Sequence, residues 1–230
     1  MENKSKWLAV SKFKKCKIMI NVSLNEIYSE TYKALRSVNI EWSLAKDSAN
    51  KAKWLAQHGQ NFLGSILKTA DLYKNKEISI SINENTNKKP LASALMGLLL
   101  VEYVSANKIT WEGYIDNSKF LLAAMGIIAE EQQINLTLEN EQKELIAFTK
   151  EKKIYVNSNL DTTVTSYSSL KTYNYIEEKN TKFTSLKKNK EVTNLNDKCW
   201  ERLKSMAFET YVPESEASKS RAGYSIYFTM

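Results

Sequence analysis

The sequence predicts an α+β protein in which an N-terminal three-helix unit packs with a mixed β-sheet and two apolar helices. Three observations predict this class. Residues 20–75 carry apolar side chains at helical spacing, and two later segments are apolar around most of a helix circumference. Residues 154–195 are rich in Thr, Ser, Tyr and Val, which is typical of short antiparallel strands. The chain is 43% hydrophobic and 26% charged over 230 residues, the profile of a soluble globular protein.

The N-terminal unit is predicted from its helix boundaries. Ser-Leu-Asn-Glu is a capping box, in which the Ser23 hydroxyl accepts from the Glu26 amide and the Glu26 carboxylate reaches back. A second helix begins near Ser43 and ends at Gly59, because glycine readily adopts the left-handed conformation that follows a helix. Asn61 is the predicted cap of a third helix.

The middle of the chain then changes to a strand pattern. EISISINEN, residues 77–85, alternates isoleucine with polar residues and predicts a strand with one buried face. Pro90 suits the first turn of the apolar helix that follows. KITWEGYID, residues 108–116, is a second predicted strand, and Asn117 or Ser118 caps the next apolar helix.

Both apolar helices contain a Met-Gly pair, at Met96-Gly97 and Met125-Gly126. A glycine inside a helix costs about 1 kcal/mol relative to alanine, so it indicates the close approach of a neighbouring element. Leu, Met, Ile and Ala surround both pairs, which favours packing contacts over ligand contacts. The two strand-helix segments, 77–107 and 109–131, suggest a weak internal repeat.

The second half is predicted to be rich in strands. INLTL and IYVNSN are strands, whereas ENEQKELIAFTKEKK, residues 139–153, is interpreted as a charged helix or turn. A final helix with Asn196 or Asp197 at its N-cap ends at Pro213. Residues 1–18 are predicted to be a basic flexible extension, and residues 19–230 a single α+β domain. The domain has a helical part at 19–75, a strand-rich part at 76–195, and a C-terminal helix and tail at 196–230. Met19 is a candidate natural start.

The net charge of +7 lies mostly at one end, because residues 1–18 hold six lysines and one glutamate. A second basic cluster, KFTSLKKNK, is explained equally well by a solvated loop and by phosphate binding. No helix-turn-helix, zinc-finger or RNP pattern is present, which disfavours a nucleic-acid partner. No apolar run approaches the roughly 20 residues that cross a bilayer, so no membrane partner is expected.

The cysteine and histidine content limits the chemistry. Two cysteines and one histidine predict no metal site and no disulfide framework, and they fit a reducing cytoplasmic setting. Dinucleotide-binding and P-loop glycine motifs are absent, so no cofactor is expected. His58 is either a general base or switch, or a helix-end side chain that contacts terminal carbonyls.

The C-terminal segment TYVPESEASKSR is the predicted polar site, and the alternative is a strap that docks across the domain surface. It follows a helix, contains one of the two prolines and groups donors with acceptors, which suits a polar or anionic small molecule. Catalytic residues are not assigned. The candidate ligand-binding residues are Tyr211, Glu214, Ser215, Glu216, Ser218, Lys219 and Arg221, with His58 from the helical unit.

Together these motifs resemble a bacterial domain-of-unknown-function family. The resemblance rests on SLNEI at residues 23–27, on the alanines, Trp54 and Leu55 that lead to Gly59, and on TYVP-x-S-E-x-S from Thr210. It extends from about residue 19 to residue 223 and implies a small single-domain cytoplasmic protein with no established reaction. Lys219 or Arg221 stands where the family pattern has arginine, and YSIYFTM departs from the pattern.

The sequence therefore favours a small-molecule-binding metabolic protein, with enzymatic activity left open. The alternative is a non-catalytic accessory or oligomeric structural subunit, in which exposed aromatic residues serve a homo-oligomer interface.

Overall fold

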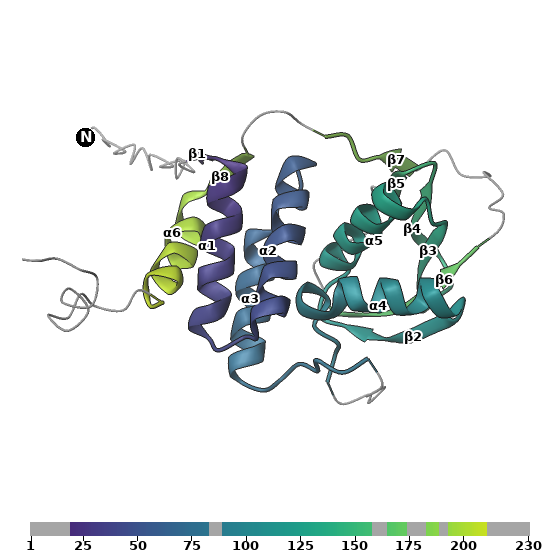
Figure 1. Cartoon of the computed structure of the whole chain (residues 1–230), viewed down its shortest axis with the longest axis horizontal. Coiled ribbons are helices and arrows are strands. Elements are labelled where there is room, and N and C mark those ends of the chain that lie inside the picture. Colours follow the sequence, from purple (N-terminus) through teal and green to yellow (C-terminus); the bar gives the residue numbers. More distant parts are fainter. Residues whose placement is uncertain (1–18, 83–88, 158–164, 174–182, 189–192, 211–230) are drawn as a thin grey trace, which may run out of the picture.

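The computed structural model describes residues 19–82, 89–157, 165–173, 183–188 and 193–210. Within these residues a group of helices stands beside a curved antiparallel sheet that holds two further helices (Figure 1). The α+β class predicted from the sequence is confirmed.

The helical half contains the three predicted helices and a fourth from the other end of the chain. α1 begins one residue after Ser23, whose hydroxyl accepts from the Glu26 amide at 3.1 Å, as the capping box predicts. α2 ends before Gly59, which has a φ of 67°. The helices are α1 (Leu24–Ser37), α2 (Trp42–Gln57), α3 (Leu63–Lys74) and α6 (Asp197–Phe208).

A short strand pair joins the beginning of this half to its end. β1 (Met19–Val22) pairs antiparallel with β8 (Thr193–Asn196), so that α6 packs against α1 and α3. The periodicity of residues 20–75 did not indicate β1. The predicted C-terminal helix is confirmed but ends at Phe208, and Pro213 lies outside the described residues.

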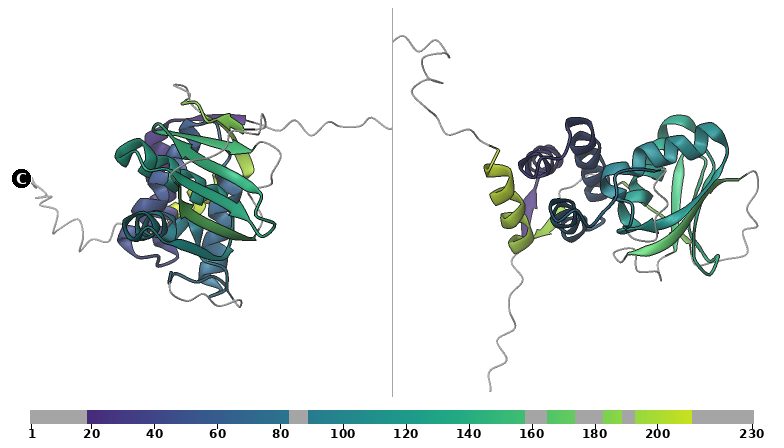
Figure 2. Two further views of the ribbon diagram at one scale, coloured as in Figure 1. Left: turned by 90° about the vertical axis from the view of Figure 1, so that its right-hand side faces the viewer. Right: turned by 90° about the horizontal axis from the view of Figure 1, so that it is seen from below.

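The second half is a six-stranded sheet in the order β2-β6-β3-β4-β5-β7. Its strand pairings are all antiparallel, whereas the sequence suggested a mixed sheet. The strands are β2 (Thr110–Ile115), β3 (Leu136–Asn140), β4 (Leu145–Lys150), β5 (Lys153–Asn157), β6 (Ser166–Thr172) and β7 (Phe183–Ser185). Helices α4 (Ser93–Asn107) and α5 (Lys119–Gln132) lie against one face of the curved sheet (Figure 2).

The two helix glycines have the packing role that the sequence indicated. A Cβ added at Gly97 would lie 3.4 Å from both the Cβ of Ala124 and the carbonyl oxygen of Phe120, so this glycine lets α4 approach α5. Gly126 faces the indole of Trp54 on α2 instead, and a Cβ there would overlap the ring. Gly126 thus joins the sheet half to the helical half.

Two predictions before α4 are wrong. Residues 77–82 form no strand, because Ser79 makes only an isolated bridge to Leu91 and Ile80 is 44% exposed. Pro90 precedes α4 rather than occupying its first turn. The reason is that Leu91 extends the sheet edge: its N–H donates to the Tyr114 carbonyl, and its carbonyl accepts from the Asp116 amide.

The interpretation of residues 139–153 as a charged helix or turn is also wrong. This segment contains β4 and its two flanking turns, which carry the charges that suggested a solvated helix. Lys143, Glu151 and Lys152 have positive φ angles in these turns. The apolar residues between them, from Ile146 to Phe148, are buried in the sheet.

The buried residues of both halves form one continuous core. α2 contacts α1 on one side and α4 and α5 on the other, and it therefore carries side chains to the boundary between the halves. No helix in the described part of the chain combines the length and apolar composition that a bilayer crossing requires.

Candidate functional site

A pocket of about 570 Å³ lies where the C-terminal ends of α2 and α5 meet β5 and the segment after β7. We call it the lysine pocket. Its volume falls within the range of small-molecule sites. The residues that line it are Trp54, His58, Glu130, Lys152, Lys153, Ile154, Tyr155, Ser185, Leu186, Lys187 and Lys188.

Four lysines and one carboxylate give the pocket a positive charge. Lys152 and Lys153 come from the turn into β5, and Lys187 and Lys188 follow β7. β5 and β7 are neighbours in the sheet, and this pairing brings the two lysine pairs to the same edge. Ammonium groups that converge on one pocket repel one another, so an anion bound between them is stabilised.

His58 lies beneath these lysines at the end of α2. Its Nδ1 is 2.8 Å from the Trp54 carbonyl oxygen. A carbonyl only accepts, so Nδ1 carries the hydrogen and Nε2 has the lone pair. The imidazole also stacks on the Trp54 indole, with ring centroids 3.8 Å apart. The ring orientation and the tautomer are therefore both fixed by α2.

The environment of His58 favours its neutral form. Burial lowers the pKa of His58 below its usual 6.5, and the charge of Lys188 lowers it further. The Trp54 carbonyl and the Glu130 carboxylate act in the opposite direction, each with an effect smaller than that of burial but larger than that of Lys188. His58 Nε2 is 3.8 Å from Glu130 Oε1, which exceeds hydrogen-bond distance and suits two acceptors with no hydrogen between them.

Glu130 connects the three other groups of this site. Its Oε2 pairs with Lys188 Nζ at 2.6 Å, and its Oε1 accepts from Trp54 Nε1 at 3.1 Å. The Glu130 side chain is 31% exposed and that of Lys188 is 51% exposed. The pair therefore lies at the pocket mouth, where a ligand can reach it.

A second pocket, of about 400 Å³, lies on the other side of Trp54 and Glu130. It has a different character, because glutamates outnumber lysine and its floor contains Leu98, Ile127 and Ile128. Among the described residues, no three His, Cys, Asp or Glu side chains gather closely enough to hold a metal ion. Because it is larger and lined by four lysines, the lysine pocket is the stronger candidate for a ligand-binding site.

A separate polar cluster lies in the interior, around Asp116. This carboxylate accepts from the Ser93 amide and hydroxyl at 2.9 and 2.6 Å, from the Thr69 hydroxyl at 2.6 Å and from the Asn117 amide at 2.8 Å. The cluster joins the end of β2 to the start of α4 and to α3. Its role is structural, because it fixes these ends where Leu91 continues the sheet.

Of the candidate site residues from the sequence, His58 belongs to the lysine pocket. The seven others, Tyr211, Glu214, Ser215, Glu216, Ser218, Lys219 and Arg221, lie outside the described residues. For His58, the predicted contact with a terminal helix carbonyl is present.

Sequence reasoning missed Trp54, Glu130, Lys152 and Lys153 as site residues. Lys187 and Lys188 gave a usable signal, since the cluster KFTSLKKNK admitted phosphate binding as one explanation. Lys152 and Lys153 did not, because they belong to the segment that was interpreted as a charged helix or turn. Only the pairing of β5 with β7 brings the lysine pairs together.

Comparison with known proteins adds no assignment to this geometry. No protein-family model, no curated protein and no solved structure matches the chain.

Proposed function

We propose that this protein binds a small molecule with a phosphate-type anionic group in the lysine pocket. The observation that carries the proposal is that the described residues bring four lysines, from two segments of the chain, to one pocket with a single carboxylate. Lysine is a common phosphate ligand, acting as a mobile point charge with three donors. This proposal keeps the anionic ligand expected from the sequence and moves its site from the C-terminal segment to the pocket that contains His58.

A solvated group of lysines is the simplest competing explanation. Two features favour a binding site over that explanation. The floor of the pocket is made by buried groups, His58 and Trp54, whose orientation is fixed by a hydrogen bond and a ring stack. Among the described residues that line the pocket, Glu130 is the one carboxylate, and it pairs with Lys188, one of the four lysines.

The proposal is tested by titrating pyrophosphate into the protein and following binding by calorimetry and thermal unfolding. We expect binding to raise the unfolding temperature, because the ligand binds only the folded chain. The variant Lys187→Gln/Lys188→Gln should bind pyrophosphate about tenfold more weakly or worse, since two charge-assisted contacts are lost.

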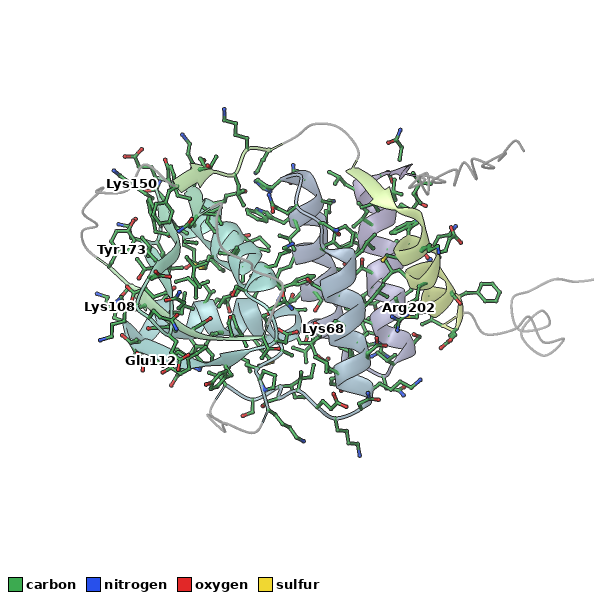
Figure 3. The ribbon with its side chains drawn as sticks, turned by 180° about the vertical axis from the view of Figure 1, so that it is seen from behind. Lys68, Lys108, Glu112, Lys150, Tyr173 and Arg202 are labelled. Carbon is green, nitrogen blue, oxygen red and sulfur yellow. The ribbon has the colours of Figure 1, made fainter. Side chains whose placement is uncertain are left out.

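The matched control is Lys68→Gln/Lys74→Gln, which removes the same charge from α3. Both control lysines are exposed, and Lys68 lies on the helical half, away from the sheet that carries Lys150 (Figure 3). Equal loss of affinity in the two double variants would mean that pyrophosphate responds to overall charge, and the pocket would then not be its site.

A further inference from the structure

Glu130 pairs with Lys188, accepts from Trp54 and lies near His58, and a bound anion would change this arrangement. Its closest contact is the ion pair with Lys188 at 2.6 Å, and its contact with His58 Nε2 is the longest, at 3.8 Å. Lys188 is also one of the four lysines that face the pocket. An anion in the pocket therefore competes with Glu130 for the Lys188 ammonium.

The two members of the ion pair differ in how they respond to this competition. Lys188 is half exposed and flexible, so it can turn toward a ligand. Glu130 is more enclosed. Once Lys188 turns away, the Trp54 N–H is the one donor that Glu130 keeps of the two named here. A partly buried carboxylate that loses its cation is destabilised unless another positive charge replaces it.

His58 is the group placed to supply that charge. Its Nε2 lone pair faces the carboxylate, and a proton there would turn the 3.8 Å contact into a charge-assisted hydrogen bond after a small movement. The groups of other elements that face the same space are Glu130 on α5, Lys152 and Lys153 at the start of β5, and Lys187 and Lys188 after β7. A bound anion offsets the charge of Lys188, which otherwise opposes protonation of the imidazole.

We propose that anion binding in the lysine pocket is coupled to proton uptake by His58, so that the pocket takes up the anion and one proton together. This inference rests on the proposed function and adds the regulation of that site by pH.

The direction of the pH dependence follows from linkage. The pKa of His58 is lowered in the free protein by burial, and the anion raises it in the complex. Between these two pKa values, the affinity of the pocket for the anion increases as the pH falls. The increase is at most about tenfold per pH unit, because one proton is taken up. Outside that window His58 contributes no change in affinity, because it has the same protonation state in both forms.

Inorganic sulfate is the appropriate probe, because its charge is constant across the range in which His58 titrates. Calorimetric titrations at about pH 8 and about pH 6 should show sulfate binding about threefold to tenfold more tightly at the lower pH. Repeating the lower-pH titration in two buffers of different ionisation enthalpy should show net uptake of a proton. His58→Gln, which keeps a polar side chain at the end of α2, should bind sulfate with an affinity that does not change with pH.

Glu130→Gln provides a second, isosteric variant that still accepts from Trp54. It frees Lys188, so sulfate should bind more tightly at high pH, and the pH dependence should shrink. Lys68→Gln is the control on α3, and it should keep the full pH dependence of the sulfate affinity.

The outcomes separate the two proposals. If sulfate and pyrophosphate both fail to bind the wild-type protein, the proposed function is wrong and this inference fails with it. If they bind but the affinity for sulfate is independent of pH, or if His58→Gln keeps the wild-type pH dependence, only the coupling is wrong.

Discussion

Lys51 is a fully buried lysine at the centre of the molecule. Its ammonium donates to the Ser93 carbonyl at a long 3.5 Å, and a Cβ placed at Gly97 would lie 3.6 Å from it. Burial lowers the pKa of Lys51 to about 7, while the charges of Asp47 and Asp116 partly oppose this shift. The protein therefore holds an amine that is only partly protonated at neutral pH.

This lysine predicts a pH-dependent stability with a definite sign. The unfolded chain keeps Lys51 protonated to about pH 10.5, whereas the folded chain releases the proton above about pH 7. The free energy of unfolding should therefore gain about 1.4 kcal/mol from this group for each pH unit above neutrality. Urea unfolding at several pH values between about 7 and about 9 measures it.

Lys51→Met isolates that contribution, because methionine has a similar length and no charge. We expect the variant to be at least as stable as the wild type at neutral pH and to lack the Lys51 part of the slope. Identical slopes in the two proteins would show that Lys51 keeps its proton in the folded state.

At the residue scale, sequence reasoning reached His58 and favoured the helix-end interpretation over the general base or switch. The structure supports the helix-end interpretation through Nδ1, and it leaves Nε2 facing a pocket. The sequence did not indicate that Lys51 is buried, because the exposed face of the same helix contains other lysines, such as Lys46. Burial of a single lysine depends on α4 and α5, which are distant in the sequence.

At the element scale, the contact between α2 and α5 depends on Gly126. The indole of Trp54 occupies the space that a side chain at this position would fill. Trp54 in turn donates to Glu130 and stacks on His58, so the same contact positions the floor of the lysine pocket. Gly126 is thus a packing glycine whose effect reaches the site.

Gly126→Ala should destabilise the protein by about 1–3 kcal/mol or more, because the indole must move from a well-packed position. Gly64→Ala on α3 is the matched control. A Cβ at Gly64 meets nothing within 4 Å, so alanine there should be neutral or stabilise by up to about 1 kcal/mol. Urea unfolding compares the two. If Gly126→Ala is as stable as Gly64→Ala, the Trp54 contact does not constrain the helix pair.

The elements differ in how far the sequence could predict them. α1 and α2 were predicted well, because capping residues and helical spacing are local properties. Of the strand expected at residues 77–85, the described part, 77–82, pairs with its neighbours only through an isolated bridge from Ser79 to Leu91. β4 was missed because charges in its turns obscured a short buried run. Strand assignment depends on pairing, which a single segment does not reveal.

At the scale of the whole molecule, the candidate site is a product of topology. α2, α5, β5 and the segment after β7 each supply residues to the lysine pocket, and they span the chain from Trp54 to Lys188. The α+β class was predictable from composition and periodicity, whereas the neighbouring positions of β5 and β7 were not. The oligomeric alternative stays a prediction, with Trp42, 67% exposed, as a candidate contact. The family resemblance likewise stays a prediction.

The single histidine of the chain offers the most direct test of the central claim, that the lysine pocket binds anions. Its imidazole gives one set of nuclear magnetic resonance signals, which report on the floor of the pocket. Titration with pyrophosphate at constant pH and ionic strength should shift these signals along a saturating curve, and Lys187→Gln/Lys188→Gln should weaken or abolish the shift. Signals of His58 that do not move while pyrophosphate binds elsewhere on the protein would contradict the account.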